Sequence, residues 1–198
     1  MKRQLFLLIL LPTLLFSQTK QDELEIIEIV NGFQINTIYV KESFDLSEIK
    51  TLLDKEKFKD YYLPKSDSII IDQTEKNYIR SQIVNNQNFI WDKTYFKDSE
   101  IVSNNNVEFY LINKNQPHIK EVDSILKSKD SVKSGIKIKN VFYCAISFSK
   151  PIFFRKGTYC ILGYKVNLQS SIKDISVSIY KKRYGKWTHY IEIYNNRR

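Results

Sequence analysis

The strongest constraint on the fold is a period-two alternation of apolar and polar residues that begins near Ile136 and continues to the C-terminal end. Successive side chains of a β-strand point to opposite faces, so this pattern predicts strands with one apolar face. In segments 142–152 and 158–168 the apolar residues occupy the even-numbered positions. Further on, odd-numbered residues such as Ile175 and Val177 carry the apolar face. The second half of the chain is therefore predicted to form an antiparallel sheet of four or five strands.

Glycines predict how these strands are joined. Opposed residues of a hairpin share a face. Because the apolar residues of both segments have even numbers, the residue numbers of each facing pair must add to an even value for the two apolar faces to be buried together. A three-residue loop, 155–157, satisfies this rule by pairing Phe154 with Thr158, and Gly157 supplies the left-handed backbone that such a loop needs. A second loop of the same kind, 183–185, is predicted between the last two strands.

The same register predicts the state of the two cysteines. Cys160 would face Ile152 and Cys144 would face Leu168, so the two sulfur atoms would lie roughly 27 Å apart along the sheet at about 3.4 Å per residue. A disulfide needs Cα atoms within about 7 Å of each other. We therefore predict two buried thiols, although an exported chain with two cysteines often pairs them.

Helical spacing of apolar residues dominates the first half of the chain. Residues 21–34 predict one helix, and segments 44–58 and 71–87 each begin with an Asp-x-x-Glu capping box, at Asp45 and at Asp72. A short strand over 69–71 is expected between them, and a fourth helix over 118–127. Helices of this kind cover the apolar face of a sheet. The predicted fold class is therefore α+β, with three or four N-terminal helices packed on a C-terminal antiparallel sheet.

The chain begins with the layout of a secretory signal peptide, residues 1–17: a basic start is followed by an apolar run over 5–16. This run is about 12 residues long, whereas a membrane span needs roughly 20, so a retained anchor is the less favoured alternative. We expect cleavage near Ser17/Gln18 and release into the periplasm or the extracellular space. Residues 18–198 are then expected to form a single α+β domain without a transmembrane segment.

Charge is divided unevenly along the expected mature chain. Residues 18–100 contain 11 Lys and Arg against 16 Asp and Glu, a net charge of −5, whereas residues 101–198 contain 18 against 6, a net charge of +12. Two interpretations remain open besides a merely solvated lysine surface. The halves attract each other across their interface, or the basic half faces an anionic partner.

Basic and aromatic side chains share the polar side of the predicted sheet. The candidate binding surface consists of Lys165, Lys181, Lys182, Tyr143, Tyr159 and Tyr190. Aromatic stacking combined with positive charge would suit an anionic glycan, a lipid head group or another envelope protein. Nucleic acid is not expected as a partner outside the cytoplasm. The alternative is that these side chains form cross-strand pairs that only stabilise the sheet.

The rival hypothesis is a small-ligand-binding or hydrolytic domain with a pocket between helices and sheet. Its candidate residues are Trp91, Asp92 and His189, because a Trp-Asp pair at the end of an element can line a sugar-binding cleft and His189 is expected to face inward. No metal, phosphate-binding, dinucleotide or nucleophile motif occurs in the sequence, so no cofactor or metal is predicted. A non-enzymatic binding module is the favoured function.

Three stretches resemble a family of uncharacterised exported proteins of Bacteroidota. They are ISFSKPIFFRKGTYCIL with its Ser-x-Pro-x-Phe strand, the Gly-Lys-Trp of residues 185–187, and YIRSQ followed by FIWD within residues 78–92. The resemblance covers roughly residues 70–190 and implies export and an α+β fold, but no activity. Relatives often carry a Cys- and Gly-rich turn after the second strand, where this chain reads NLQSSIKDIS.

Alkylation of the exported, denatured protein without reductant tests the cleavage site and the cysteine state together. Intact mass spectrometry should show a chain that starts near Gln18 and carries two alkyl groups. A chain without alkyl groups and two protons lighter would mean that Cys144 and Cys160 are joined, and would contradict the hairpin register.

Overall fold

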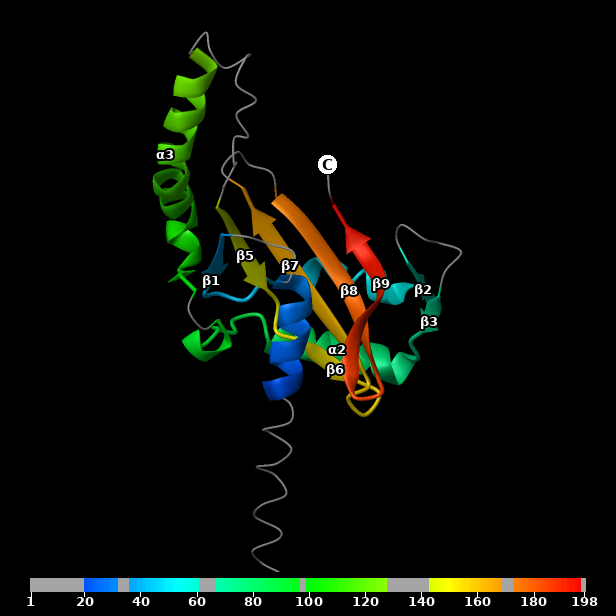
Figure 1. The fold of residues 1–198 in the computed structure, drawn as a ribbon. Coiled ribbons are helices and arrows are strands. Elements are labelled where there is room, and N and C mark those ends of the chain that lie inside the picture. Colours follow the sequence, from blue (N-terminus) through cyan, green and yellow to red (C-terminus); the bar gives the residue numbers. More distant parts are fainter. Residues whose placement is uncertain are drawn as a thin grey trace, which may run out of the picture.

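The computed structural model describes the chain from Lys20 onward in six segments: 20–31, 36–60, 67–96, 99–127, 143–168 and 173–196. The predicted signal peptide, residues 1–17, lies outside the described residues. The fold is α+β: a seven-stranded mixed sheet, mainly antiparallel, with helices against it (Figure 1).

The sheet is larger than predicted because short strands from outside the C-terminal segment join it. Its strands are β1 (Thr37–Val40), β4 (Ile101–Val102), β5 (Cys144–Phe148), β6 (Ile152–Phe154), β7 (Tyr159–Asn167), β8 (Lys173–Arg183) and β9 (Lys186–Asn195). Their order is β4-β1-β5-β7-β8-β9, and β6 also pairs with β7. β1 runs parallel to β4 and to β5, so the expectation of four or five purely antiparallel strands was wrong. A separate antiparallel pair consists of β2 (Lys57–Lys59) and β3 (Ser68–Ile70).

Three α-helices occur in the described part of the chain: the N-terminal helix over residues 20–31, α2 (Gln73–Asn85) and α3 (Val107–Lys127). The capping box predicted for α2 is confirmed, with both reciprocal bonds between Asp72 and Glu75 present. The box predicted at Asp45 is wrong. The Asp45 carboxylate instead accepts from the backbone N–H and the hydroxyl of Ser47, which closes a tight turn. Residues 44–58 form two 3₁₀ turns, η1 (Ser47–Ile49) and η2 (Leu52–Asp54), and then enter β2.

Helix α3 begins a full eleven residues before the predicted start at residue 118, and Pro117 lies inside it. The reason is tertiary. Val107 and Leu111 are one helical turn apart, and both are buried against Ile38 and Val40 of β1. Burial of this stripe compensates for the proline, which removes a backbone hydrogen bond inside the helix.

Both faces of the sheet are buried, whereas the alternation predicted one apolar face. On the first face the even-numbered side chains of β5 and β7 pack against the N-terminal helix and the 89–96 connector, with the buried residues Ile26, Ile27, Trp91, Phe96, Ile146, Phe148, Cys160 and Leu162. On the second face, strands β6 to β9 pack against α2, the 3₁₀ turns and the β2–β3 pair, with Leu46, Leu53, Phe58, Ile79, Ile161, Val177, Ile179 and Ile191. The first half of the chain thus supplies cover for two faces.

A break near Pro151 changes the register of the first hairpin. Between β5 and β7 the predicted even rule holds, since Ile146 faces Val166. Past Pro151 the pairing shifts by one residue, because two residues of one strand oppose one of the other. Phe154 therefore faces Tyr159 instead of Thr158. The shift turns alternate side chains of β6 to the second face, where they join its core.

The last hairpin also turns side chains to the second face, but through a different turn and different irregularities. Its connection is a two-residue turn, Tyr184-Gly185, with φ angles of 51° and 79°, and not the predicted three-residue loop. Irregularities between Ile179 and Tyr180 and again between Val177 and Ser178 then shift the register. The first of them places Ile179 opposite Ile191, so both contribute to the second face.

Neither cysteine takes part in a disulfide, as predicted, and both are buried. Cys144 is the first residue of β5 and lies near the last residues of β7, whereas Cys160 is near the start of β7. Cys160 faces Phe153, not the expected Ile152. Burial raises the pKa of both thiols. These are core residues and poor nucleophiles.

A buried asparagine connects α3 to the sheet. The side-chain amide of Asn115 donates to the carbonyl oxygen of Tyr143 at 3.1 Å, and its oxygen accepts from the N–H of Tyr143 at 2.7 Å. The amide thus satisfies both backbone groups of a residue just before β5, as a neighbouring strand would.

Replacement of this amide should be costly. Asn115→Ala leaves the partly buried backbone N–H and carbonyl of Tyr143 without these bonds and opens a gap at a fully buried position, so we expect the free energy of unfolding to fall by about 2–3 kcal/mol in urea denaturation. The matched control is Asn113→Ala on the exposed side of the same helix, which should change it by less than about 0.5 kcal/mol. Equal effects of the two substitutions would contradict the assigned role.

Candidate functional site

Ion pairs join the acidic half of the chain to the basic half. Among the described residues there are six ion pairs, and five combine a base from residues 101–198 with an acid from residues 18–100. These five are Lys114–Glu100, Lys150–Glu23, Arg155–Glu75, Lys182–Asp22 and Arg183–Asp67. The interpretation that the two halves attract each other is therefore confirmed for the described residues. These five bases therefore serve to join the two halves.

The N-terminal helix is docked by its acidic first turn. Glu23 is only 4% exposed, and its carboxylate accepts from the Lys150 ammonium group at 2.7 Å and from the Tyr95 hydroxyl at 2.8 Å. Burial and the Glu23 carboxylate raise the pKa of Tyr95. Asp22 accepts from the Trp187 indole at 3.0 Å and pairs with Lys182. Because Lys182 is used in this contact, it does not contribute an unpaired charge to a binding surface.

The structure disperses half of the predicted binding residues. Tyr143 packs beside α3, where the Lys114 ammonium group lies 5.5 Å from its ring centre. Lys165 lines a polar cleft at the far end of β7. Lys182 pairs with the N-terminal helix. These three do not join Tyr159, and the predicted continuous basic face is replaced by a smaller surface.

Tyr159, Lys181 and Tyr190 do come together, at the tips of the β6–β7 and β8–β9 hairpins. The Lys181 ammonium group lies 5.1 Å from the ring centre of Tyr159 and 5.2 Å from that of Tyr190, and the two rings meet edge to face. The Arg155 guanidinium lies 5.1 Å from the Tyr159 ring centre, and that of Arg183 lies 6.0 Å from the Tyr190 ring centre. Positive charge is thus spread over an aromatic platform.

We call this region the hairpin-tip surface. Its basic residues are Arg155, Lys156, Lys181, Arg183 and Lys186, and its aromatic residues are Tyr78, Phe153, Tyr159, Tyr184 and Tyr190. Acidic groups compensate two of the bases, since Arg155 pairs with Glu75 and Arg183 with Asp67. Within the described residues no acidic group pairs with the other three, which are Lys156, Lys181 and Lys186.

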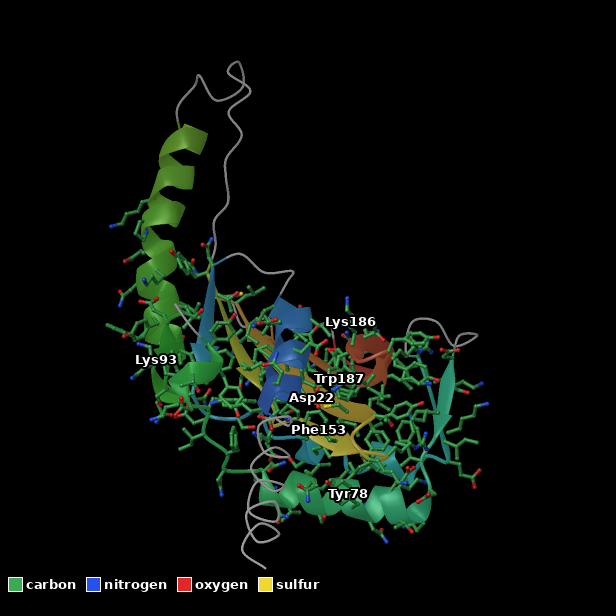
Figure 2. The ribbon with its side chains drawn as sticks, turned by 60° about the horizontal axis from the view of Figure 1, so that its bottom comes forward. Asp22, Tyr78, Lys93, Phe153, Lys186 and Trp187 are labelled. Carbon is green, nitrogen blue, oxygen red and sulfur yellow. The ribbon has the colours of Figure 1, made fainter. Side chains whose placement is uncertain are left out.

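An open groove of about 580 Å³ runs between α2 and the edge strand β6 on this surface. Tyr78, which is 45% exposed, and Phe153 line it together with the 154–157 segment. Both residues are labelled in Figure 2, Tyr78 on α2 and Phe153 on β6. The groove therefore places aromatic side chains next to the basic tip of the first hairpin.

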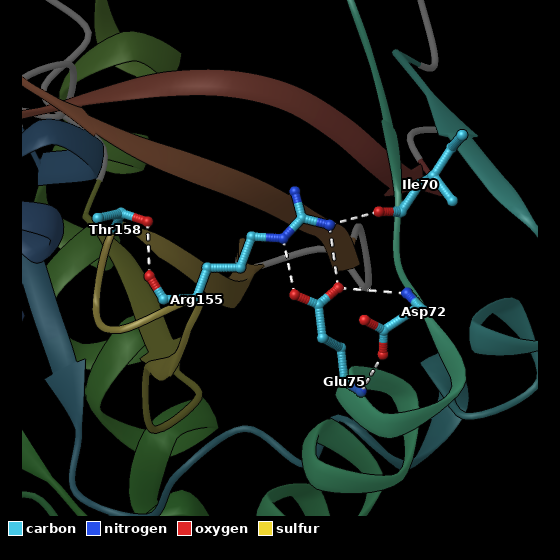
Figure 3. Close-up of polar contacts among 5 residues, drawn as sticks. All are labelled: Ile70, Asp72, Glu75, Arg155 and Thr158. Carbon is cyan, nitrogen blue, oxygen red and sulfur yellow. Dashed lines mark hydrogen bonds and ion pairs between the residues drawn. The ribbon is translucent and has the colours of Figure 1, made fainter.

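Arg155 holds the groove together, as Figure 3 shows. Its Nε and a terminal nitrogen donate to the two carboxylate oxygens of Glu75 at 2.7 and 2.9 Å, and the terminal nitrogen also donates to the carbonyl oxygen of Ile70. One Glu75 oxygen accepts from the backbone N–H of Asp72 at 3.2 Å as part of the capping box. One carboxylate thus links the start of α2 to the tip of the β6–β7 hairpin.

The residues proposed for the rival pocket do not line the groove. Trp91 is buried, and its indole donates to the carbonyl oxygen of Phe148 at 3.0 Å. Asp92 is exposed and caps the 3₁₀ turn η3 (Lys93–Tyr95), where hydrogen bonds from Thr94 lower the pKa of its carboxyl group. His189 is exposed, and its ring contacts the Ser178 hydroxyl at 3.2 Å. Its inward placement was predicted from a simple alternation of side chains, which the β8–β9 irregularities interrupt.

A second, polar cleft of about 280 Å³ lies on the second face of the sheet. It is lined by Glu42, Ser43, Phe44, Asp45, Ser47, Asn104, Ser147, Lys165 and Asn167. The sequence does not reveal it because β1, which precedes Glu42, was not predicted. The basic residues of the hairpin tips, in contrast, are visible in the sequence as the RKG and RYGK stretches around the two turn glycines.

No protein-family model, curated protein or solved structure matches this chain. Within the described residues, no helix has the length and apolar character needed to cross a membrane. The same part of the chain contains no group of three or more His, Cys, Asp or Glu side chains that could hold a metal ion.

The Arg155–Glu75 contact should be sensitive to loss of the planar guanidinium. Arg155→Lys keeps the charge but removes the two-point contact and the bond to Ile70, so the free energy of unfolding should fall by about 1 kcal/mol in this partly exposed setting. The control is Arg80→Lys, whose partner Asp54 is largely exposed and which should change it by less than about 0.5 kcal/mol. Equal changes in urea midpoint would argue against the clamp.

Proposed function

We propose that this protein is an exported, non-enzymatic binding module that holds an anionic polysaccharide of the cell envelope on its hairpin-tip surface. The observation that carries the proposal is that Lys156 lines an aromatic groove and that Lys181 and Lys186 lie on the neighbouring hairpin, while none of the three has an acidic partner among the described residues. Export rests on the signal-peptide pattern of residues 1–17.

The chemistry of the surface fits a polysaccharide with acidic groups. Sugar rings stack on exposed aromatic faces such as Tyr78, and acidic substituents meet ammonium groups held beside the groove. Lys181 is positioned between two tyrosine rings, which limits its freedom before binding and so reduces the entropy lost on binding. Tyr184, fully exposed at the tip of the second hairpin, extends the aromatic character beyond the groove.

The arrangement also favours a polymer over a small anion. The basic residues come from the tips of two hairpins, with the groove running along only one of them. A ligand that contacts both tips gains from each charge, and each contact is individually weak and screened by salt. Binding is therefore expected to depend on chain length and ionic strength.

Removal of the three unpaired lysines should weaken binding to an anionic polysaccharide such as alginate. At about 1 kcal/mol per lysine near an anionic surface, Lys156→Gln/Lys181→Gln/Lys186→Gln should bind at least about tenfold more weakly at about 0.15 M salt. Isothermal titration calorimetry or retention on immobilised polymer would measure the change, and the thermal midpoint would confirm the fold.

The matched control removes the same charge elsewhere. Lys55, Lys93 and Lys120 are exposed and lie outside the two hairpins. The triple glutamine variant at these positions should retain nearly wild-type binding. If both triple variants lose affinity equally, only net charge matters, and the assignment of a specific surface is wrong.

A further inference from the structure

The polar cleft on the second face of the sheet lies where the three parallel strands end. β1 ends two residues before Glu42, β4 ends two residues before Asn104, and Ser147 is the last residue but one of β5. In open sheets with parallel strands, ligands bind outside the carboxyl ends of those strands. Neighbouring β7 supplies Lys165 and Asn167 from the sheet itself.

The cleft is held open by hydrogen bonds that do not need a ligand. The Glu42 carboxylate accepts from the Ser103 hydroxyl at 2.9 Å and from the backbone N–H of Asn104 at 2.7 Å, and the Ser147 hydroxyl donates to the Glu42 carbonyl oxygen at 3.0 Å. Burial raises the pKa of Glu42, but the bonds from Asn104 and Ser103 outweigh it and hold the pKa below its usual value. Glu42 is thus a fixed carboxylate that follows β1 and is bonded to the start of the 3₁₀ turn η4 (Asn104–Asn106), which leads into α3.

The aromatic side of the cleft is fixed as well. Phe44 packs with Leu46 directly over Gly163 of β7. A Cβ atom at this glycine would lie 2.5 Å from a Leu46 methyl group and 3.1 Å from the Phe44 ring, so a larger residue would displace both side chains. The Phe44 ring therefore has a defined position among polar groups, since Asp45 and Ser47 follow it in the lining.

The functional groups of the lining select the class of ligand. Carboxylates accept hydrogen bonds, and amides and hydroxyls both donate and accept, which matches the hydroxyl groups of a sugar. The side-chain amides of Asn104 and Asn167 form no hydrogen bond with any other described residue. Two carboxylates, Glu42 and Asp45, against the one lysine disfavour an anionic ligand. The volume of about 280 Å³ is at the lower end for ligand sites and suits one ring.

We propose that this cleft binds a single sugar residue that is neutral or carries an amino group, with Asn104 and Asn167 bonding its hydroxyls and Phe44 contacting its ring. This site is separate from the hairpin-tip surface and prefers the opposite charge. A protein with both sites would hold an acidic polymer at one place and a neutral or amino sugar at another.

Titration with monosaccharides tests the proposal. N-acetylglucosamine, glucosamine, galactose and glucose would be compared with glucuronate and glucose 6-phosphate by calorimetry and by ligand-observed NMR. We expect at least one neutral or amino sugar to bind with a millimolar or lower dissociation constant, and the acidic sugars to bind more weakly. Asn104→Ala/Asn167→Ala should weaken binding about tenfold or more, since it removes two polar contacts.

Two controls make the outcome decisive. Asn105→Ala/Asn106→Ala alters the same 3₁₀ turn outside the cleft lining and should bind as the wild type does. The triple lysine variant at the hairpin tips should also bind the sugar normally, which separates this proposal from the proposed function. No binding of any of the four sugars at about 20 mM, stronger binding of the acidic sugars, or an unchanged affinity in the Asn104/Asn167 variant would overturn it.

Discussion

Strand β7 is the element on which the rest of the structure depends, because it pairs with β5, β6 and β8 and is buried on both faces. Cys160 and Leu162 lie in the core beneath the N-terminal helix, whereas Ile161 between them lies in the core shared with α2. Neither face can be left to water, so the first half of the chain must cover both. Gly163 allows Phe44 and Leu46 to approach the strand, and the polar cleft lies beside this contact.

Electrostatics explains how the covering elements find their places. The acidic first turn of the N-terminal helix meets Lys150 and Lys182, and Glu75 at the start of α2 meets Arg155. Pairs such as these add little net stability by themselves, but they disfavour other placements because a buried charge without its partner is costly. Three bases without an acidic partner in the described segments, Lys156, Lys181 and Lys186, lie at the hairpin tips, whereas others such as Lys55, Lys93 and Lys120 lie elsewhere. The two proposed sites thus lie where the covering layers leave the sheet accessible.

Local patterns were predictive wherever local interactions decide the structure. The capping box at Asp72 starts α2, and the alternation of β5 and β7 marks true strands with two buried thiols. Prediction failed where contacts distant in sequence decide. β1 was missed although its residues Thr37–Val40 all favour strands, because four residues do not show whether a strand will find partners, here β4 and β5. α3 extends through Pro117 because its first turns pack on β1. The hairpin registers also differed, since one irregular residue reverses the face of every later side chain.

The amino-acid sequence by itself determined the α+β class, the separate cysteines, the division of charge into an acidic and a basic half, and the basic residues beside both turn glycines. These follow from spacing and composition, which act over a few residues or over the whole chain. Only the tertiary structure decided which bases remain without an acidic partner in the described segments, where the aromatic groove lies, and that Glu42, Asn104 and Asn167 share one cleft. The reason is physical: each of these depends on register and on packing between segments more than fifty residues apart, which no local pattern encodes.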